Sequence, residues 1–183
     1  SQAAMVYQPA AATNVQPVPG KMNGLTFVAP PEPFPENPMP AVQSTGASWI
    51  AVVPYAFTRP GDASVRFDEN GQHWWGERPA GARETIRLAH EVGIKVMLKP
   101  QVWIPRHWTG TLDFATDAEW DSWEADYERY ILRFATLADS AGADMFCIGT
   151  EFRNAIEKRP QFWNSLIVKI KQVYKGKLTY SSN

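Results

Sequence analysis

The chain is poor in cysteine and histidine, with a single cysteine and three histidines among 183 residues. One cysteine excludes an intrachain disulfide and any zinc site built from several thiolates. Cys147 lies inside the apolar run from Met145 to Ile148, which is typical of a small buried hydrophobe. His73 and His107 have no partner at metal-ligand spacing, and His90 falls on an expected helix, so we expect neither a metal nor a cofactor.

The sequence also lacks an excess of charge of one sign and any apolar run long enough to cross a membrane. Its 18 basic and 19 acidic residues give a net charge of −1, and the basic residues are scattered along the chain. Without a basic patch, neither nucleic acid nor an acidic membrane surface is expected as a partner. Glycine-rich phosphate loops and the G-x-S-x-G elbow of serine hydrolases are missing as well. The enzyme classes that depend on these motifs are therefore disfavoured.

What the sequence does contain is an alternation of short apolar strands with amphipathic helices. This order, with short helix-to-strand turns and long strand-to-helix loops, predicts a parallel α/β protein of the (β/α)8 TIM-barrel type. An open doubly wound sheet is the alternative, but it lacks a G-x-G-x-x-G loop to support it. Strands are expected at residues 22–28, 49–53, 94–98, 145–151 and 177–183, and helices at 38–45, 79–92, 116–141 and 160–174.

Five strands and four helices make only part of such a barrel, which needs about 250 residues when complete. Half a barrel would leave open sheet edges and an exposed inner face. We therefore expect the C-terminal remainder of the barrel, or a second copy, to complete it. Residues 1–20 read as a disordered linker or cloning remnant, and residues 21–183 as the N-terminal part of the barrel. The compartment stays open, with an extracytoplasmic location favoured over a cytoplasmic one.

The stretch from Asp144 to Asn154, DMFCIGTEFRN, carries the best candidate for a catalytic group. It begins as a buried strand, turns polar, and delivers one acid, Glu151, at the strand's end. Strand alternation places Glu151 on the same face as Met145 and Cys147, and bulky Phe146 and Ile148 on the opposite face, toward the helices. Glu151 should therefore look inward at the carboxyl-terminal rim, where barrel enzymes keep their active sites.

Aromatic and polar residues gather in the loops that lead from the same rim. Flat indole faces suit the apolar faces of sugar rings, and inward polar groups at strand ends can hydrogen-bond hydroxyls. Anchoring of the loops to the barrel and a barrel-closing polar network are the structural alternatives. Other tryptophans, such as Trp120, Trp123 and Trp163, lie on helix stripes and are expected in the core. The candidate sugar-binding residues are Tyr55, Trp74, Trp75, Lys99, Gln101, Trp103, Trp108 and Asn183.

These motifs resemble the family 113 glycoside hydrolases, which are β-mannanase-type members of a clan of retaining (β/α)8 glycosidases. The likeness spans about residues 22–183, and its most specific motif is Ile148-Gly-Thr-Glu151. The resemblance implies that Glu151 is the general acid/base, and it places strand-end residues such as Lys99 and Gln101 on the sugar. The other matching runs are Ala89-His90, GIKVMLKP ending at Pro100, Trp108 to Gly110, Trp120 to Tyr127, Trp163 to Ile167, Leu178 to Tyr180, and Asn183.

The resemblance also implies something that the sequence does not contain. In the family the nucleophile is a Glu at the end of strand seven, so the partner of Glu151 is expected beyond Asn183. Many relatives also have a histidine and an acid after strand three, where this chain reads Pro100-Gln-Val-Trp103, so the sugar can differ from mannan. A retaining glycosidase needs both carboxyl groups, so these residues alone are expected to hydrolyse nothing. The alternative is a non-catalytic carbohydrate-binding or scaffold protein built on a degenerate barrel.

Overall fold

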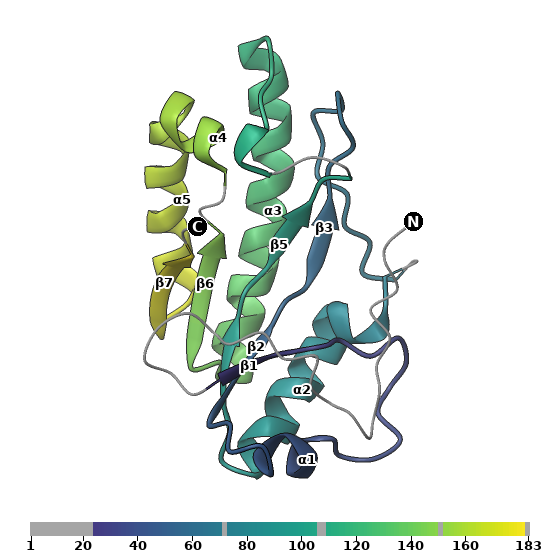
Figure 1. The fold of residues 1–183 in the computed structure, drawn as a ribbon. Coiled ribbons are helices and arrows are strands. Elements are labelled where there is room, and N and C mark those ends of the chain that lie inside the picture. Colours follow the sequence, from purple (N-terminus) through teal and green to yellow (C-terminus); the bar gives the residue numbers. More distant parts are fainter. Residues whose placement is uncertain (1–23, 71–72, 106–108, 150–151, 182–183) are drawn as a thin grey trace.

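The computed structural model describes residues 24–70, 73–105, 109–149 and 152–181, and these form a parallel sheet with helices packed on one face (Figure 1). Five strands form this sheet in the order β1-β2-β4-β6-β7, with every neighbouring pair parallel. Their bounds are β1 Gly24–Phe27, β2 Trp49–Val52, β4 Lys95–Leu98, β6 Met145–Gly149 and β7 Lys177–Ser181. The five strands expected from the sequence are all present.

Three long helices cover the outer face of the sheet, with α3 lying between α2 and α5 in Figure 1. The α-helices are α1 Met39–Gln43, α2 Pro79–Glu91, α3 Asp117–Ala141, α4 Arg153–Lys158 and α5 Pro160–Val173, and two short 3-10 helices are η1 Trp75–Glu77 and η2 Thr109–Thr111. The sequence predicted four of the α-helices and missed α4. None of the described helices is both long and apolar enough to cross a membrane.

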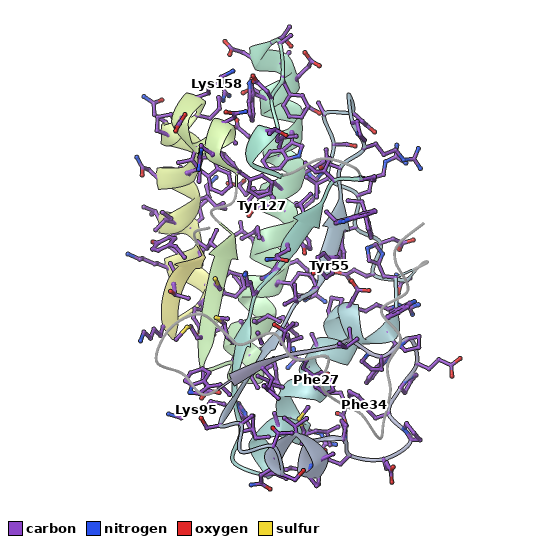
Figure 2. All side chains as sticks on the ribbon, viewed as in Figure 1. Phe27, Phe34, Tyr55, Lys95, Tyr127 and Lys158 are labelled. Carbon is purple, nitrogen blue, oxygen red and sulfur yellow. The ribbon has the colours of Figure 1, made fainter. Side chains whose placement is uncertain are left out.

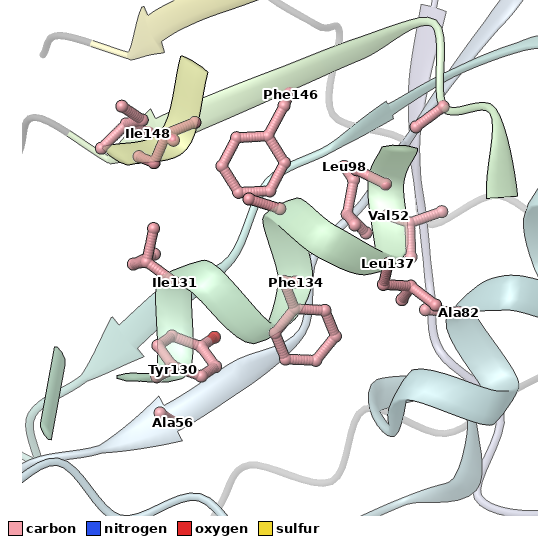
Figure 3. Packing of buried hydrophobic residues seen from close by; sticks show 14 of the residues in the cluster. Val52, Ala56, Ala82, Leu98, Tyr130, Ile131, Phe134, Leu137, Phe146 and Ile148 are labelled. Atoms are coloured by element: carbon pink, nitrogen blue, oxygen red, sulfur yellow. The ribbon is translucent and has the colours of Figure 1, made fainter. Parts of the chain in front are cut away.

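The two faces of the sheet bury different side chains, as strand alternation predicted. Phe146 and Ile148 of β6 are buried in the main core, where the sheet packs against α3 (Figure 3). On the other face, Ala51, Met97 and Cys147 belong to a separate small cluster with Met145. The buried residues of the inner face are thus small or unbranched, with half-buried Trp49 and Val53 packed against them, while the main core lies on the helix side.

Helix α3 is fixed at both ends by the signals that the sequence contains. The Thr116 hydroxyl oxygen accepts a hydrogen bond from the Glu119 backbone N–H at 3.2 Å, and Thr116 and Glu119 also bond through their side chains at 2.9 Å. This is a capping-box pair, at the start of the helix expected from residue 116. Gly142 ends the helix with a φ of 75°, a conformation that glycine adopts at little cost. The register of α3 is therefore set, and with it the positions of the side chains that reach the candidate site.

Two segments expected to be loops are strands instead. Tyr55–Phe57 (β3) and Gln101–Trp103 (β5) form a separate parallel pair, which we call the ribbon. The strands were expected to end at residues 53 and 98, short of Pro54 and Pro100, and proline has no N–H to donate to a strand. A proline carbonyl still accepts, however, and Pro54 O receives the backbone N–H of Gln101 at 2.9 Å. The prolines interrupt β2 and β4, and pairing resumes beyond them.

Candidate active site

The ribbon brings together three of the predicted sugar-binding residues. Tyr55 is in register with Gln101, and Phe57 with Trp103 (Tyr55 is labelled in Figure 2). All four are half-buried, whereas the alternate residues Ala56 and Val102 are buried in the core on the helix side. Since residues with even numbers face the helices in β2 and β4 too, the four ribbon residues continue the inner face of the sheet.

Phe57 is a candidate site residue that the sequence analysis missed. Its ring meets Trp103 edge-on, with centroids 5.9 Å apart and planes at 87°, so the two rings form one aromatic surface. The signal was present, because Phe57 continues the alternation that runs through Ala51 and Tyr55. Treating this segment as a loop removed the reason to apply that alternation.

Lys99 lies at the interruption between β4 and β5 and is half-buried. Its backbone N–H donates to Val52 O at 2.8 Å, which keeps β2 and β4 together up to the prolines. By position it shares the inner face with Met97 and Gln101. Its contact with a sugar hydroxyl stays a prediction.

Trp74 and Trp75 lie at the start of η1, and both are half-buried. The Trp75 ring meets Phe34 edge-on, with centroids 5.5 Å apart, and its backbone N–H donates to Pro31 O at 3.1 Å. Trp75 therefore helps to attach η1 to the segment that follows β1. A sugar-binding role for either tryptophan stays a prediction.

Three predicted site residues, Glu151, Trp108 and Asn183, lie outside the described residues. The chain on the far side of Glu151 is described, and there Phe152 is 3% exposed. The Phe152 ring packs against Trp123 of α3, with centroids 5.2 Å apart, and against Trp163 of α5 at 5.7 Å. Both tryptophans are buried, which confirms their predicted place in the core. The residue that follows Glu151 is thus anchored between two helices.

Two ionisable groups that were not expected in the site lie beside Tyr55: Glu77, which is buried, and His73, which is half-buried. Glu77 of η1 is 6% exposed, and burial raises the pKa of its carboxyl to about 7, although a hydrogen bond from the Tyr55 backbone opposes the shift. Burial lowers the pKa of His73, whose ring also bonds to the Tyr55 backbone. An acid just before a helix start ordinarily reads as a solvated charge, so the sequence held no signal for the burial of Glu77.

The raised pKa of Glu77 makes stability depend on pH. Between about pH 4.5 and pH 7 the folded protein holds a proton that the unfolded chain has released, so stability falls as the pH rises across this window, by about 3 kcal/mol in total. His73 opposes this below about pH 6.5, since its lowered folded pKa makes stability rise with pH there. The two groups can partly cancel in the wild type.

We therefore expect the free energy of unfolding of Glu77→Gln, minus that of the wild type, to increase from about pH 5 to about pH 8. A glutamine stays neutral at every pH, so the variant avoids the cost of a buried charge, and subtraction removes the contribution of His73. Urea denaturation at four pH values measures the difference. A difference that stays constant would show that Glu77 titrates as it does in the unfolded chain.

Among the residues that the structure describes, no group of three His, Cys, Asp or Glu side chains could hold a metal ion. The expectation that the protein needs no metal stays a prediction. The functional groups in the described part of the site are half-buried aromatic rings, amide and ammonium groups on the inner face of the sheet, and one buried carboxyl behind them. Such a surface can stack on a sugar ring and hydrogen-bond its hydroxyls.

A parallel sheet with helices on one face, and with polar and aromatic side chains gathered at its carboxyl ends, defines part of a (β/α)8 barrel of the enzyme type. Residues 32–183 match the model of Glycoside Hydrolase Family 113. The chain belongs to this family, as the resemblance in its sequence indicated.

Solved structures of the same family share this fold. One is a GH113 β-mannanase from Alicyclobacillus acidocaldarius in complex with ManMIm, at 26% identity and a TM-score of 0.69, over 78% of this chain and 46% of that one. Another is a complex structure of a GH113 β-1,4-mannanase, at 26% identity and a TM-score of 0.63, over 75% of this chain and 45% of that one. The chain thus spans under half the length of these structures. A comparison with curated proteins gave no match.

Proposed function

We propose that this chain is the N-terminal part of a retaining glycoside hydrolase that cleaves β-linked mannan or a related polysaccharide. The observation that carries the proposal is the match of residues 32–183 to the family model. The solved relatives are described as β-mannanases, which supports a β-mannoside as the substrate. Because a polysaccharide cannot cross a membrane, we place the reaction outside the cytoplasm.

In this proposal Glu151 is the general acid/base. It follows β6 directly, and the strand's inner residues, Met145 and Cys147, line the apolar cluster of the inner face. For this role the carboxyl must be protonated near neutral pH, which requires a raised pKa. It can then protonate the leaving glycosidic oxygen and afterwards take a proton from the attacking water.

A second carboxylate must attack the anomeric carbon from about 5–5.5 Å away. We propose that it comes from a part of the barrel beyond residue 183, and that residues 1–183 alone do not hydrolyse sugars. Tyr55, Phe57, Gln101 and Trp103 would bind the sugar from the ribbon. Lys99, Trp74, Trp75, Trp108 and Asn183 are proposed to complete the binding surface.

Incubation of the full-length protein with β-1,4-mannooligosaccharides tests the proposal. We expect new reducing ends, with the first-formed product carrying the β-anomer because two inversions restore the configuration. Reducing-end assays and proton NMR of the anomeric signal measure both. α-Linked mannooligosaccharides serve as the control and should not be cleaved. An α-anomeric first product would exclude retention, and the absence of cleavage of every β-linked glycan would exclude the enzyme.

A further inference from the structure

The backbone groups on the edge of β3 that faces away from β5 are hydrogen-bonded in two different ways. Pro54 O and the Thr58 N–H bond to β5, so the backbone groups of Tyr55 and Phe57 face the opposite edge. Phe57 is paired there by backbone: its N–H donates to Arg66 O at 3.0 Å, and the Arg66 N–H donates to Phe57 O at 2.7 Å. At Tyr55 the same edge meets two side chains, those of Glu77 and His73.

These side chains take the place of a neighbouring strand at Tyr55. The Tyr55 bond lowers the pKa of Glu77, as expected where a backbone N–H donates to a carboxyl, so the Tyr55 N–H donates to Glu77. The His73 bond raises the ring pKa, as expected where a ring N–H donates to the Tyr55 carbonyl. Both halves of the Tyr55 backbone edge are therefore held by side chains from the segment just before α2. We call this arrangement the Tyr55 clamp.

Backbone contacts fix the position of the clamp. In η1, the Gly76 N–H donates to Pro30 O at 2.8 Å, and a Cβ on Gly76 would lie 2.2 Å from Pro30 Cδ. A Cβ on Gly81 of α2 would lie 2.0 Å from Trp75 O. Arg78 Nε donates to His73 O at 2.9 Å. Since neither glycine site has room for a side chain, Glu77 is delivered to Tyr55 by closely packed backbone.

The clamp buries polar atoms that an apolar side chain in the same space would not contain. Glu77 is 6% exposed, and among the described residues its Oε1 and the Nε2 of His73 have no hydrogen-bond partner. Burying polar atoms without partners is unfavourable, but a leucine in place of Glu77 would leave the Tyr55 N–H without its acceptor. What the carboxyl provides is an acceptor for one N–H of β3.

We propose that Glu77 and His73 are positioning residues, which hold the ribbon so that its aromatic face meets the sugar. Tyr55 and Phe57 present their side chains on the inner face, in register with Gln101 and Trp103. Hydrogen bonds along the outer edge of β3 would keep the strand in this register. On the other side, the Tyr130 hydroxyl of α3 donates to Pro54 O at 2.8 Å. The inference rests on the proposed function, because it assigns the ribbon to substrate binding.

The test compares Glu77→Leu with Glu77→Gln in the full-length protein. Leucine fills the volume without an acceptor, and glutamine keeps one, so the pair isolates the hydrogen bond to Tyr55. In Glu77→Leu we expect loss of amide-exchange protection at residues 55–57, with β2 and β4 unchanged. We also expect KM for β-1,4-mannooligosaccharides to rise about 10-fold while kcat stays within about 2-fold. Glu77→Gln should match the wild type within about 2-fold in both constants.

His73→Phe is a second variant, which keeps the ring contacts to Phe57 and Phe67 and removes the hydrogen bonds of the imidazole to the Tyr55 and Asp68 backbones. It should raise KM in the same way. Unchanged protection at Tyr55 in Glu77→Leu would overturn the clamp, and lost protection with unchanged KM would overturn its role in binding. If the wild type cleaves no glycan, the proposed function fails on its own, and the exchange data still decide whether the clamp exists.

Discussion

Replacing Glu151 with glutamine is expected to lower kcat/KM of the full-length protein on β-1,4-mannooligosaccharides by about 10²–10⁴-fold. Glutamine has nearly the same shape as glutamate but cannot give a proton to the leaving oxygen or take one from water. The loss should therefore appear in kcat, with the affinity for the oligosaccharide preserved. Steady-state kinetics and calorimetric binding of a mannooligosaccharide measure the two quantities separately.

The dependence of the rate on the leaving group distinguishes a general acid/base from a residue that is needed for folding or binding. An aryl glycoside with an acidic phenol needs little help from an acid to depart, so the bond-breaking step of Glu151→Gln should be much less impaired on it. Glu157→Gln is the matched control, since Glu157 is an exposed carboxylate on α4 only six residues along the chain. Equal losses on both substrates, or an equal loss in Glu157→Gln, would contradict the assignment.

The second large effect concerns the packing of the sheet on α3. Phe134 of α3 is fully buried, and its ring meets Phe67 and Tyr130 with centroids 5.3 and 5.4 Å apart. Figure 3 labels it among the packed residues of the main core. Truncation to alanine removes a whole ring from close-packed surroundings. We expect Phe134→Ala to lower the free energy of unfolding by about 4 kcal/mol.

Urea denaturation followed by tryptophan fluorescence measures this loss. Val168→Ala on α5 is the control, because Val168 is 57% exposed and its truncation should change stability by less than about 0.5 kcal/mol. Similar losses in the two variants would show that Phe134 is not in the close-packed core.

Local patterns in the sequence were sufficient to predict the faces of a strand and the ends of a helix. The alternation in Met145 to Ile148 placed bulky side chains toward the helices, and the buried clusters confirm this. The capping box at Thr116 and the glycine at Gly142 set the ends of α3 within a residue. Each of these signals acts over a few residues, so it can be read from the chain without knowledge of its neighbours.

The expectation of loops after Pro54 and Pro100 was wrong. Pro54 and Pro100 end a strand by local rules, yet β3 and β5 follow them and pair with each other. The reason is non-local, because Tyr130 lies many residues along the chain and its hydroxyl holds both Pro54 O and Gln101 O, at 2.8 and 3.2 Å. No window of sequence around Pro54 contains that contact.

The sequence by itself determined the order of the five strands of the main sheet and of four α-helices, the face on which the bulky residues of β6 lie, and the family resemblance that singles out Glu151. These follow from periodicity and from motifs carried by consecutive residues. Only the tertiary structure decided that Tyr55, Phe57, Gln101 and Trp103 share one surface, and that Glu77 is buried behind it. Burial and side-by-side placement depend on which distant segments pack together. The free energy gained by that packing can offset the cost of removing a carboxyl from water.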